Sequence, residues 1–364
     1  MNILVLSSRS APGHLADVNA YDFEDSVIDG AGADLHVIGG DRTALKPAYD
    51  LLIVCGISFH SVLDLVERVE AKGPLPPTGR RLAYVLGAYG HVVRQSKSPL
   101  HRLVRRLTGD RLRKFRLFDC VYLGIPDYAV DIETALGVPT RYLPMAANVL
   151  PVQARPYCSR EDRPISVSAP GRQHAGIVNA ICDRLNRPES TELALRFDAW
   201  TGSLNDLPRY RAMFWQVLRM SRVLMAFDHV YANPTGRNVL SHVGPRWFEA
   251  LAAGTVVAGR GPATEEAGAL LNWPDAFIDV DADPQTAAEE IAALVADEDR
   301  LRAASRRNLV EMHARHDWRH RLSSILEIEG FDRPARLHGQ LQVLEAQAET
   351  LRSGGNLIRP IEVL

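Results

Sequence analysis

Three observations predict an α/β fold made of two tandem doubly wound domains. Short apolar runs rich in Val, Ile and Leu alternate with stretches of helical periodicity. The apolar runs are continuous, which is typical of parallel strands covered by helices on both faces. A proline-rich stretch interrupts the pattern once, and the pattern then begins again. A chain of 364 residues also exceeds what one core readily serves, so two domains are expected.

The first domain is predicted over residues 1–155. Helical spacing of apolar side chains indicates a helix over 61–72. Prolines between 144 and 164 remove backbone donors and disfavour helix, so this stretch is predicted to be the linker between domains. The predicted strands are 2–6, 34–38, 51–55, 82–86, 120–123 and 140–143.

The second domain is predicted over 156–330. Asp283 can cap free amides and Pro284 suits a first helical turn, so a helix is expected to begin there. The remaining residues, 331–364, are predicted to form a helical tail, with the first domain as one surface for it to pack on. The predicted strands are 165–169, 193–197, 225–227, 255–258 and 276–280, and the predicted helices include 176–185, 285–296 and 338–351.

Composition narrows the functional class. The formal net charge is −2, which does not indicate a general polyanion binder. The four cysteines lie far apart without a C-x-x-C pair, which argues against a disulfide framework or a zinc site. No apolar run approaches the roughly 18 residues that span a bilayer. The N-terminus also lacks the basic region of a signal peptide. A cytoplasmic location is therefore predicted.

The most informative motif lies at residues 244–257, which read Gly-Pro-Arg-Trp-Phe-Glu-Ala-Leu-Ala-Ala-Gly-Thr-Val-Val. Phe248 and Leu251 follow helical spacing, and the small residues around them allow a helix to approach a sheet closely. This segment resembles the donor-side motif of GT-B glycosyltransferases of the glycosyltransferase group 1 family. Residues 168–172, 6–14 and 142–148 also resemble segments of that family.

The resemblance implies a fold, an activity and a co-substrate. The fold would be GT-B, with two Rossmann-like domains facing each other across a cleft. The first domain would bind the acceptor and the second the nucleotide sugar. The activity would be transfer of a hexose from a nucleotide-diphosphate sugar to an acceptor hydroxyl, without a metal or other cofactor.

Within the motif, a helix beginning near Gly244 would point amides and a partial positive charge at a diphosphate. Glu249, one turn into that helix, could accept hydrogen bonds from a ribose diol. The alternative is a buried cap or salt bridge. Many family members carry a second Glu at the position of Ser241. Ser241 or His242 could take over its contact with the sugar.

Basic side chains complete the predicted donor side. Arg172 and Arg246 are candidates to clamp the diphosphate, because the planar guanidinium suits phosphate oxygens. Surface or helix salt bridges are the alternatives for both. His174 could assist when protonated, and Gly13 could allow the backbone to approach the donor closely.

Candidates for a catalytic base come from the first domain. His91 follows the predicted strand 82–86, so it lies at a carboxyl end, where such sheets bind ligands. Histidine titrates near neutrality and is a common base. A structural loop histidine is the alternative. His14 and Asp17, after the first strand, are the second choice.

A basic segment over 94–116 holds nine basic residues and one acidic residue, for a net charge of +8. An apolar stripe runs through it, so it could lie on an anionic membrane as a peripheral contact at its inner face. It could equally hold an anionic acceptor such as nucleic acid, or be a core-facing helix with a solvated basic face. The acceptor itself stays open among a glycan, a lipid-linked glycan, a natural product and a polyanion. The contact candidates are Arg94, Lys97, Arg102, Arg105 and Arg106.

No metal site is predicted. Asp279, Asp281 and Asp283 mimic a D-x-D metal motif, but their place between a strand and a helix indicates a turn. Two alternatives to the transferase remain at this point. One is a sugar-nucleotide epimerase of the same fold, and the other is a non-catalytic protein that binds nucleotide or polyanion.

Overall fold

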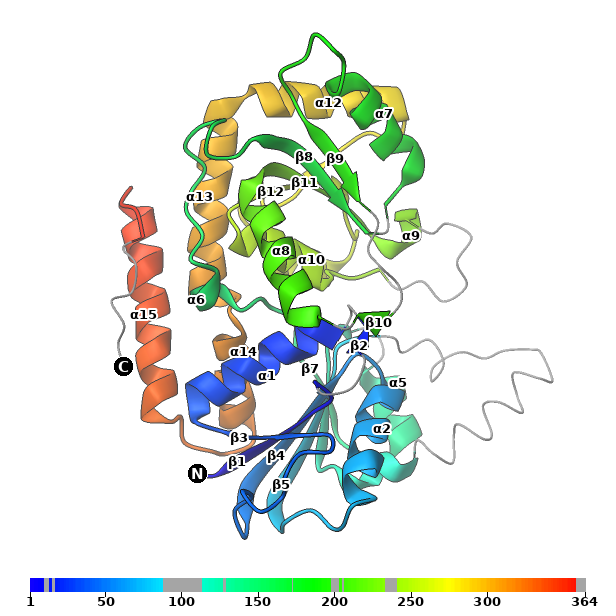
Figure 1. The fold of residues 1–364 in the computed structure, drawn as a ribbon, viewed down its shortest axis with the longest axis vertical. Helices are drawn as coiled ribbons and strands as arrows, with labels where there is room; N and C mark the ends of the chain where they lie inside the picture. Colours follow the sequence, from blue (N-terminus) through cyan, green and yellow to red (C-terminus); the bar gives the residue numbers. More distant parts are fainter. Residues whose placement is uncertain are drawn as a thin grey trace, which may run out of the picture. The chain divides into compact units, whose positions relative to one another are not determined.

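The computed structural model describes residues 1–9, 13–14, 17–87, 113–126, 129–171, 173–197, 203–204, 206–232 and 241–357. The chain divides into two compact units (Figure 1). Unit 1 comprises Met1–Met145, Gly202–Asn205 and Trp318–Gln340, and unit 2 comprises Ala146–Thr201, Asp206–Asp317 and Leu341–Leu364. The chain thus leaves unit 1 earlier than the predicted boundary at 155. It also returns to unit 1 for a stretch that the pattern had grouped partly with 156–330 and partly with the tail 331–364.

Unit 1 contains a parallel sheet in the order β3-β1-β4-β5-β6-β7. Each strand overlaps the apolar run that predicted it. The strands are β1 (Ile3–Ser7), β3 (Asp34–Val37), β4 (Tyr49–Gly56), β5 (Thr78–Val85), β6 (Cys120–Leu123) and β7 (Thr140–Tyr142). The helices are α1 (Val18–Ala31), α2 (Phe59–Glu70), the 3-10 helix η2 (Arg113–Leu117), α5 (Ala129–Leu136) and α14 (Trp318–Ile328).

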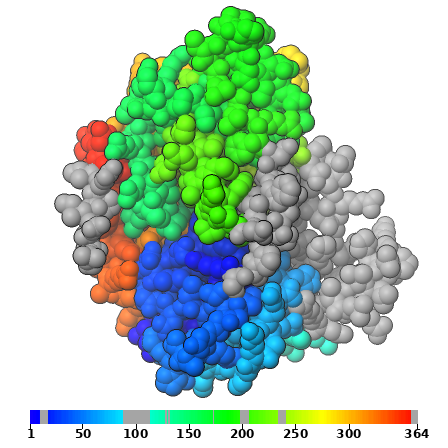
Figure 2. Space-filling view, in the orientation of Figure 1, coloured from blue at the N-terminus to red at the C-terminus, as the bar shows by residue number. Residues whose placement is uncertain are grey.

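Helix α14 packs in unit 1 although it lies far along the chain. The Trp318 ring meets Phe23 of α1 at 5.4 Å and Tyr84 of β5 at 6.0 Å between centroids, both edge-to-face. Just beyond the helix, the buried carboxylate of Glu329 accepts a hydrogen bond from Tyr122 at 2.6 Å. Aromatic burial and this buried bond anchor α14 to the first sheet. In Figure 2 the residues of the N-terminal segment, drawn in blue, form part of the visible surface of unit 1.

A short antiparallel pair, β2 (Gly13–His14) with β10 (Ser203–Leu204), also belongs to unit 1. The sequence did not predict it, because two-residue strands carry no periodicity. The remaining helix, α15 (Ala335–Arg352), has its residues up to Gln340 in unit 1 and those from Leu341 in unit 2. Its Gln340 accepts a hydrogen bond from Arg319 of α14 at 2.7 Å.

Unit 2 contains a parallel sheet in the order β13-β12-β11-β8-β9. The predicted strand 276–280 is observed only over Ile278–Asp279. The strands are β8 (Ile165–Pro170), β9 (Ala194–Phe197), β11 (Ser221–Phe227), β12 (Val256–Arg260) and β13 (Ile278–Asp279). The helices are α6 (Val149–Val152), α7 (Ala175–Leu185), α8 (Leu207–Met220), α9 (His229–Ala232), α10 (Pro245–Ala252), α11 (Glu265–Leu270), α12 (Pro284–Ala296) and α13 (Glu298–Arg315).

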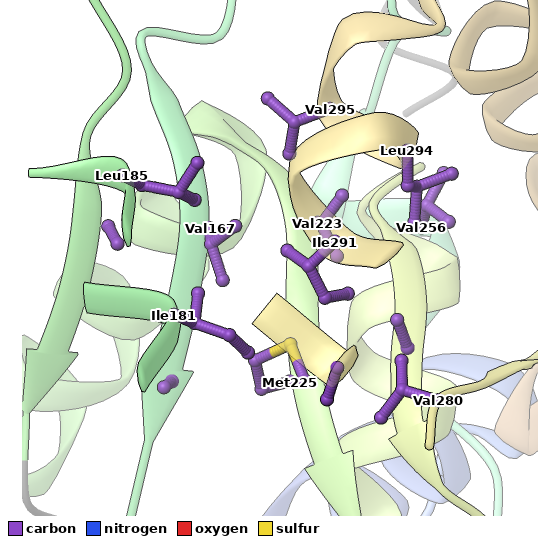
Figure 3. Close-up of a cluster of buried hydrophobic side chains, with 14 of the residues drawn as sticks. Val167, Ile181, Leu185, Val223, Met225, Val256, Val280, Ile291, Leu294 and Val295 are labelled. Carbon is purple, nitrogen blue, oxygen red and sulfur yellow. The ribbon is translucent and has the colours of Figure 1, made fainter. Parts of the chain in front are cut away.

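The core of unit 2 forms where α7 and α12 cover one face of its sheet (Figure 3). Val167 and Met225 from the strands face Ile181 of α7 and Ile291 of α12, and all are buried. Burial of such side chains contributes about 1.5–3 kcal/mol each to the free energy of folding. This packing anchors β8 and β11 to the helices of unit 2.

The position of Arg163 explains why residue 254 of the 244–257 motif is a glycine. This buried guanidinium donates to the carbonyl oxygens of Arg155 at 2.8 Å and Ala253 at 2.7 Å. Gly254 follows α10 with φ +68°, and a Cβ there would lie 2.9 Å from the Arg163 guanidinium. Glycine is therefore required both for the backbone conformation and for the close approach.

The strand order reverses direction once in each sheet. In unit 2 the chain passes from β8 to β9 on one side and then to β11 on the other. In unit 1 the corresponding neighbours are β1 and β4. Open α/β sheets bind ligands outside the carboxyl ends of strands at such a point.

Among the residues described, no helix is both long and apolar enough to cross a bilayer.

Candidate functional site

Gln173 joins the carboxyl ends of β8 and β11 at the reversal point of unit 2. Its Nε2 donates to the carbonyl oxygens of Pro170 at 2.8 Å and Met225 at 3.1 Å. Gly171, at φ +69°, makes the turn that brings this side chain back over the strands. The Oε1 atom is buried and has no hydrogen-bond partner among the described residues. Gln173 thus fixes the two strand ends and leaves an acceptor oxygen beside them.

His174 caps the N-terminus of α7. Its Nδ1 accepts a hydrogen bond from the Ile177 amide at 3.3 Å, and its ring lies 6.0 Å from that of Phe227. A ring nitrogen that accepts carries no proton, so in the capping state the proton is on Nε2. The sequence suggested that His174 could assist at the diphosphate when protonated. In this capping geometry Nε2 is the ring nitrogen left to donate to a ligand.

Asp228 follows the last residue of β11 and is buried. Its Oδ2 accepts a hydrogen bond from the Ser241 hydroxyl at 2.6 Å, while Oδ1 is buried without a partner within the described ranges. The His229 and His242 rings lie 5.5 Å apart in the same two segments. The sequence singled out Ser241 but missed Asp228. A charged residue directly after the apolar run of β11 was the available signal.

Helix α10 begins at Gly244, which has extended φ and ψ of −83° and 172°. Gly244 has no side chain with which to cap the first amides, and Pro245 occupies the first helical position. Arg246 is half-buried in the first turn. The N-cap residue therefore contributes no side chain to the positive end of the helix, where an anion is favoured.

Glu249 lies one turn further and is buried, with 5% of its surface exposed. Its Oε1 pairs with Nη1 of Arg211 on α8 at 2.5 Å. The sequence left ribose binding and a buried salt bridge open for Glu249. The structure shows the salt bridge, and Oε2 has no recorded hydrogen bond among the described residues. Arg211 was not anticipated.

At the reversal point of unit 1, Glu24 of α1 is buried beneath the end of β1. Its Oε2 accepts from the Ser7 hydroxyl at 2.6 Å and from Arg9 Nε at 3.0 Å. Burial raises the pKa of Glu24 to about 7, against the opposing effect of Arg9. This acidic group was not anticipated from the sequence.

The predicted catalytic and acceptor residues are only partly covered by the structure. Asp17 directly precedes α1, and its side chain makes no capping hydrogen bond to that helix. Gly13 and His14 contribute backbone to β2. The other candidates lie outside the described residues: His91, Arg94, Lys97, Arg102, Arg105, Arg106 and Arg172.

The D-x-D mimic is a turn, as predicted. Asp283 accepts from the Thr286 amide at 2.9 Å and caps α12, and Asp279 accepts from the Gly261 amide at 3.2 Å. Over the described part of the chain, no group of three or more His, Cys, Asp or Glu side chains could hold a metal ion.

Comparison with known proteins shows which proteins this chain resembles. Residues 184–327 match a family model described as glycosyl transferase-like. Among solved structures, HepE of Anabaena in complex with UDP-glucose is similar with a TM-score of 0.53 and 12% identity, covering 91% of this chain and 99% of HepE. An α-glucosyltransferase in complex with UDP-glucose and DNA is similar with a TM-score of 0.51 and 11% identity, covering 90% of this chain and 98% of the other.

The chain has the GT-B fold of glycosyltransferases. The prediction of a GT-B fold is thereby confirmed, and residues 184–327 are similar to the glycosyl transferase-like family. No curated protein matches the sequence. In this GT-B protein, Asp228, Ser241 and the start of α10 lie within the matched residues 184–327, whereas Gln173 and His174 precede them.

Proposed function

We propose that this GT-B protein transfers a sugar from a nucleotide-diphosphate sugar to an acceptor hydroxyl, without a metal or other cofactor. One observation carries the proposal. In the unit with the glycosyltransferase-like match, the polar groups at the reversal point precede the N-termini of α7 and α10. Helix N-termini at such a point favour a bound diphosphate.

The proposed chemistry is electrostatic stabilisation of the leaving diphosphate. Negative charge develops on the diphosphate as the bond to the sugar breaks, and fixed positive ends and donors lower the energy of that state. The start of α10, Arg246 and Nε2 of His174 would supply these donors, with Arg172 as a further clamp. Oε2 of Glu249 would accept from the ribose diol.

The acceptor oxygens of Asp228 and Gln173 suit a different part of the donor. A carboxylate and an amide oxygen repel phosphate but accept hydrogen bonds from hydroxyl groups. Both residues are buried, so a bound hydroxyl would satisfy an oxygen that otherwise lacks a partner among the described residues. We therefore assign them to hydroxyls of the donor.

For the first domain we propose that it binds the acceptor and supplies the base, with His91 ahead of His14 and Asp17. The related structures contain UDP-glucose, which makes UDP-glucose the first donor to test. One of them also contains DNA, so polyanions belong among the acceptors to screen. The basic segment 94–116 would contact such an acceptor or an anionic membrane surface.

The test is donor binding followed by donor turnover in EDTA. UDP, GDP, TDP and UDP-glucose are titrated while the unfolding temperature is followed, because a ligand of the native state must raise it. Intact-mass analysis then detects glycosyl transfer, and analysis of the recovered donor detects epimerisation. Glu249→Gln should weaken donor binding about tenfold, whereas the exposed Glu265→Gln on α11 should not. If no nucleotide raises the unfolding temperature, the proposal fails.

A further inference from the structure

A partly buried arginine outside the 244–257 motif pairs with the motif's glutamate. Arg211 and Glu249 come from α8 and α10, whose residues contact each other within unit 2. Nη1 of Arg211 lies 2.5 Å from Oε1 of Glu249, and their side chains are 12% and 6% exposed. A buried pair at this distance gives the carboxylate a defined orientation, because the guanidinium donates along a fixed plane.

Aromatic side chains hold the guanidinium itself. The Arg211 guanidinium lies 4.7 Å from the ring centre of Trp215 and 5.6 Å from that of Phe214. These rings are three and four residues further along α8, which places them on the same face of the helix. Stacking on two rings restricts the guanidinium, so its restraint passes on to Glu249.

The ion pair with Arg211 engages only one of the two carboxylate oxygens of Glu249. Oε1 is engaged by Arg211, and Oε2 has no recorded hydrogen bond among the described residues. A carboxylate that was free to rotate would lose side-chain entropy on binding a diol, and the ion pair removes that cost beforehand.

We propose that Arg211 is a positioning residue for the donor: it fixes Glu249 so that Oε2 accepts from a hydroxyl of the donor ribose. This inference rests on the proposed function, because it requires a nucleotide donor in unit 2. In this role Arg211 would not contact the nucleotide itself. It acts through Glu249, so its loss should reduce the preference for a complete ribose more than the affinity for the diphosphate.

The test measures discrimination between intact and deoxygenated riboses. Dissociation constants are determined for UDP and GDP, each with its 2′-deoxy and 3′-deoxy form. The proteins compared are the full-length wild type, Arg211→Met, Arg211→Lys and Arg209→Met. Arg209 lies on the same helix with an exposed side chain, so Arg209→Met is the matched control for removing a positive charge. Arg211→Lys keeps the charge but not the planar fork, and it serves if Arg211→Met does not fold.

We measure the ratio of the dissociation constant of the deoxy form to that of the intact nucleotide. For wild type we expect this ratio to be about ten or more, as for the loss of a hydrogen bond to a charged group. The ratio should fall to near one in Arg211→Met and at least about threefold in Arg211→Lys, and it should stay at the wild-type value in Arg209→Met. An unchanged ratio in the folded Arg211 variants overturns the proposal. So does a wild type that binds both forms equally. A wild type that binds no nucleotide overturns the donor site itself, which is a separate and recognisable result.

Discussion

Ser241 donates its hydroxyl hydrogen to Oδ2 of Asp228 across 2.6 Å. This bond ties the segment that leads into α10 to the carboxyl end of β11, the middle strand of the unit 2 sheet. Asp228 is buried, so the Ser241 hydroxyl is a large part of what compensates its charge. The position of the α10 N-terminus relative to the strand ends therefore depends on this pair.

Ser241→Ala should lower the free energy of unfolding by about 1–3 kcal/mol, because it removes a partner from a buried carboxylate. Denaturant unfolding measures the change. The double variant Ser241→Ala with Asp228→Ala should lose less than the sum of the two single variants, since neither partner is then left unpaired. Ser324→Ala removes a hydroxyl hydrogen bond at an exposed site and should change stability by less than about 0.5 kcal/mol. A simple sum in the double variant would contradict the coupling.

Gly244→Asp should move stability and nucleotide affinity in opposite directions. Gly244 has extended backbone dihedrals, and a Cβ there meets ordinary contacts of 3.7 Å or more. The new carboxylate can cap α10 and stabilise the protein by roughly a few tenths of a kcal/mol relative to glycine. The same carboxylate would occupy the place proposed for the diphosphate and repel it. We expect at least tenfold weaker binding of UDP or GDP by calorimetry, with wild-type affinity in Gly244→Ala. Undiminished binding in Gly244→Asp would place the diphosphate elsewhere.

His174→Asn should separate capping from donor binding. Asn offers an oxygen that can accept from the Ile177 amide, so helix α7 keeps its cap. With that oxygen in the place of Nδ1, its Nδ2 group does not reach the position of Nε2–H, so the affinity for a nucleoside diphosphate should fall several-fold. His174→Ala loses both functions and should also cost about 1 kcal/mol of stability. Equal affinity in wild type and His174→Asn would remove His174 from the donor site.

Glu24 should make stability fall as pH rises through the acidic range. Burial raises its pKa from 4.5 to about 7, so between these values the native state keeps a proton that the unfolded chain has lost. Stability then decreases with rising pH, by up to about 1.4 kcal/mol per pH unit from this group. Glu24→Gln should flatten the dependence between pH 4.5 and 7, as measured by denaturant unfolding. The exposed Glu265→Gln should leave the wild-type slope, and a steep slope in Glu24→Gln would assign the titration to another group.

The architecture could be predicted because burial on both faces of a parallel sheet leaves a direct mark on the chain. Residues 120–123 were predicted as a strand from their apolar run, and β6 occupies Cys120–Leu123. The helix over Pro245–Ala252 and the strand after it follow from the spacing of large and small residues in the motif. Asp283 was likewise predicted as a cap, because a short acidic side chain before proline satisfies free amides locally.

The partners of the site residues could not be predicted in the same way. Arg211 lies 38 residues before Glu249, and Asp228 lies 13 residues before Ser241. Trp318 reads as part of the second half of the chain, yet it packs on Phe23 in unit 1. Periodicity shows which face of an element is buried, but it does not show which surface that face will meet.

Sequence pattern alone was therefore enough for the fold class, the places of the strands of the two parallel sheets and the motif that carries Glu249, because each depends on local conformation and burial. Tertiary structure decided that Glu249 pairs with Arg211, that Ser241 donates a hydrogen bond to Asp228 and that His174 caps α7 through Nδ1. The first two depend on how separate elements pack, and the third on the angle at which the chain enters a helix. Packing and approach angle follow from the whole set of contacts rather than from any one segment.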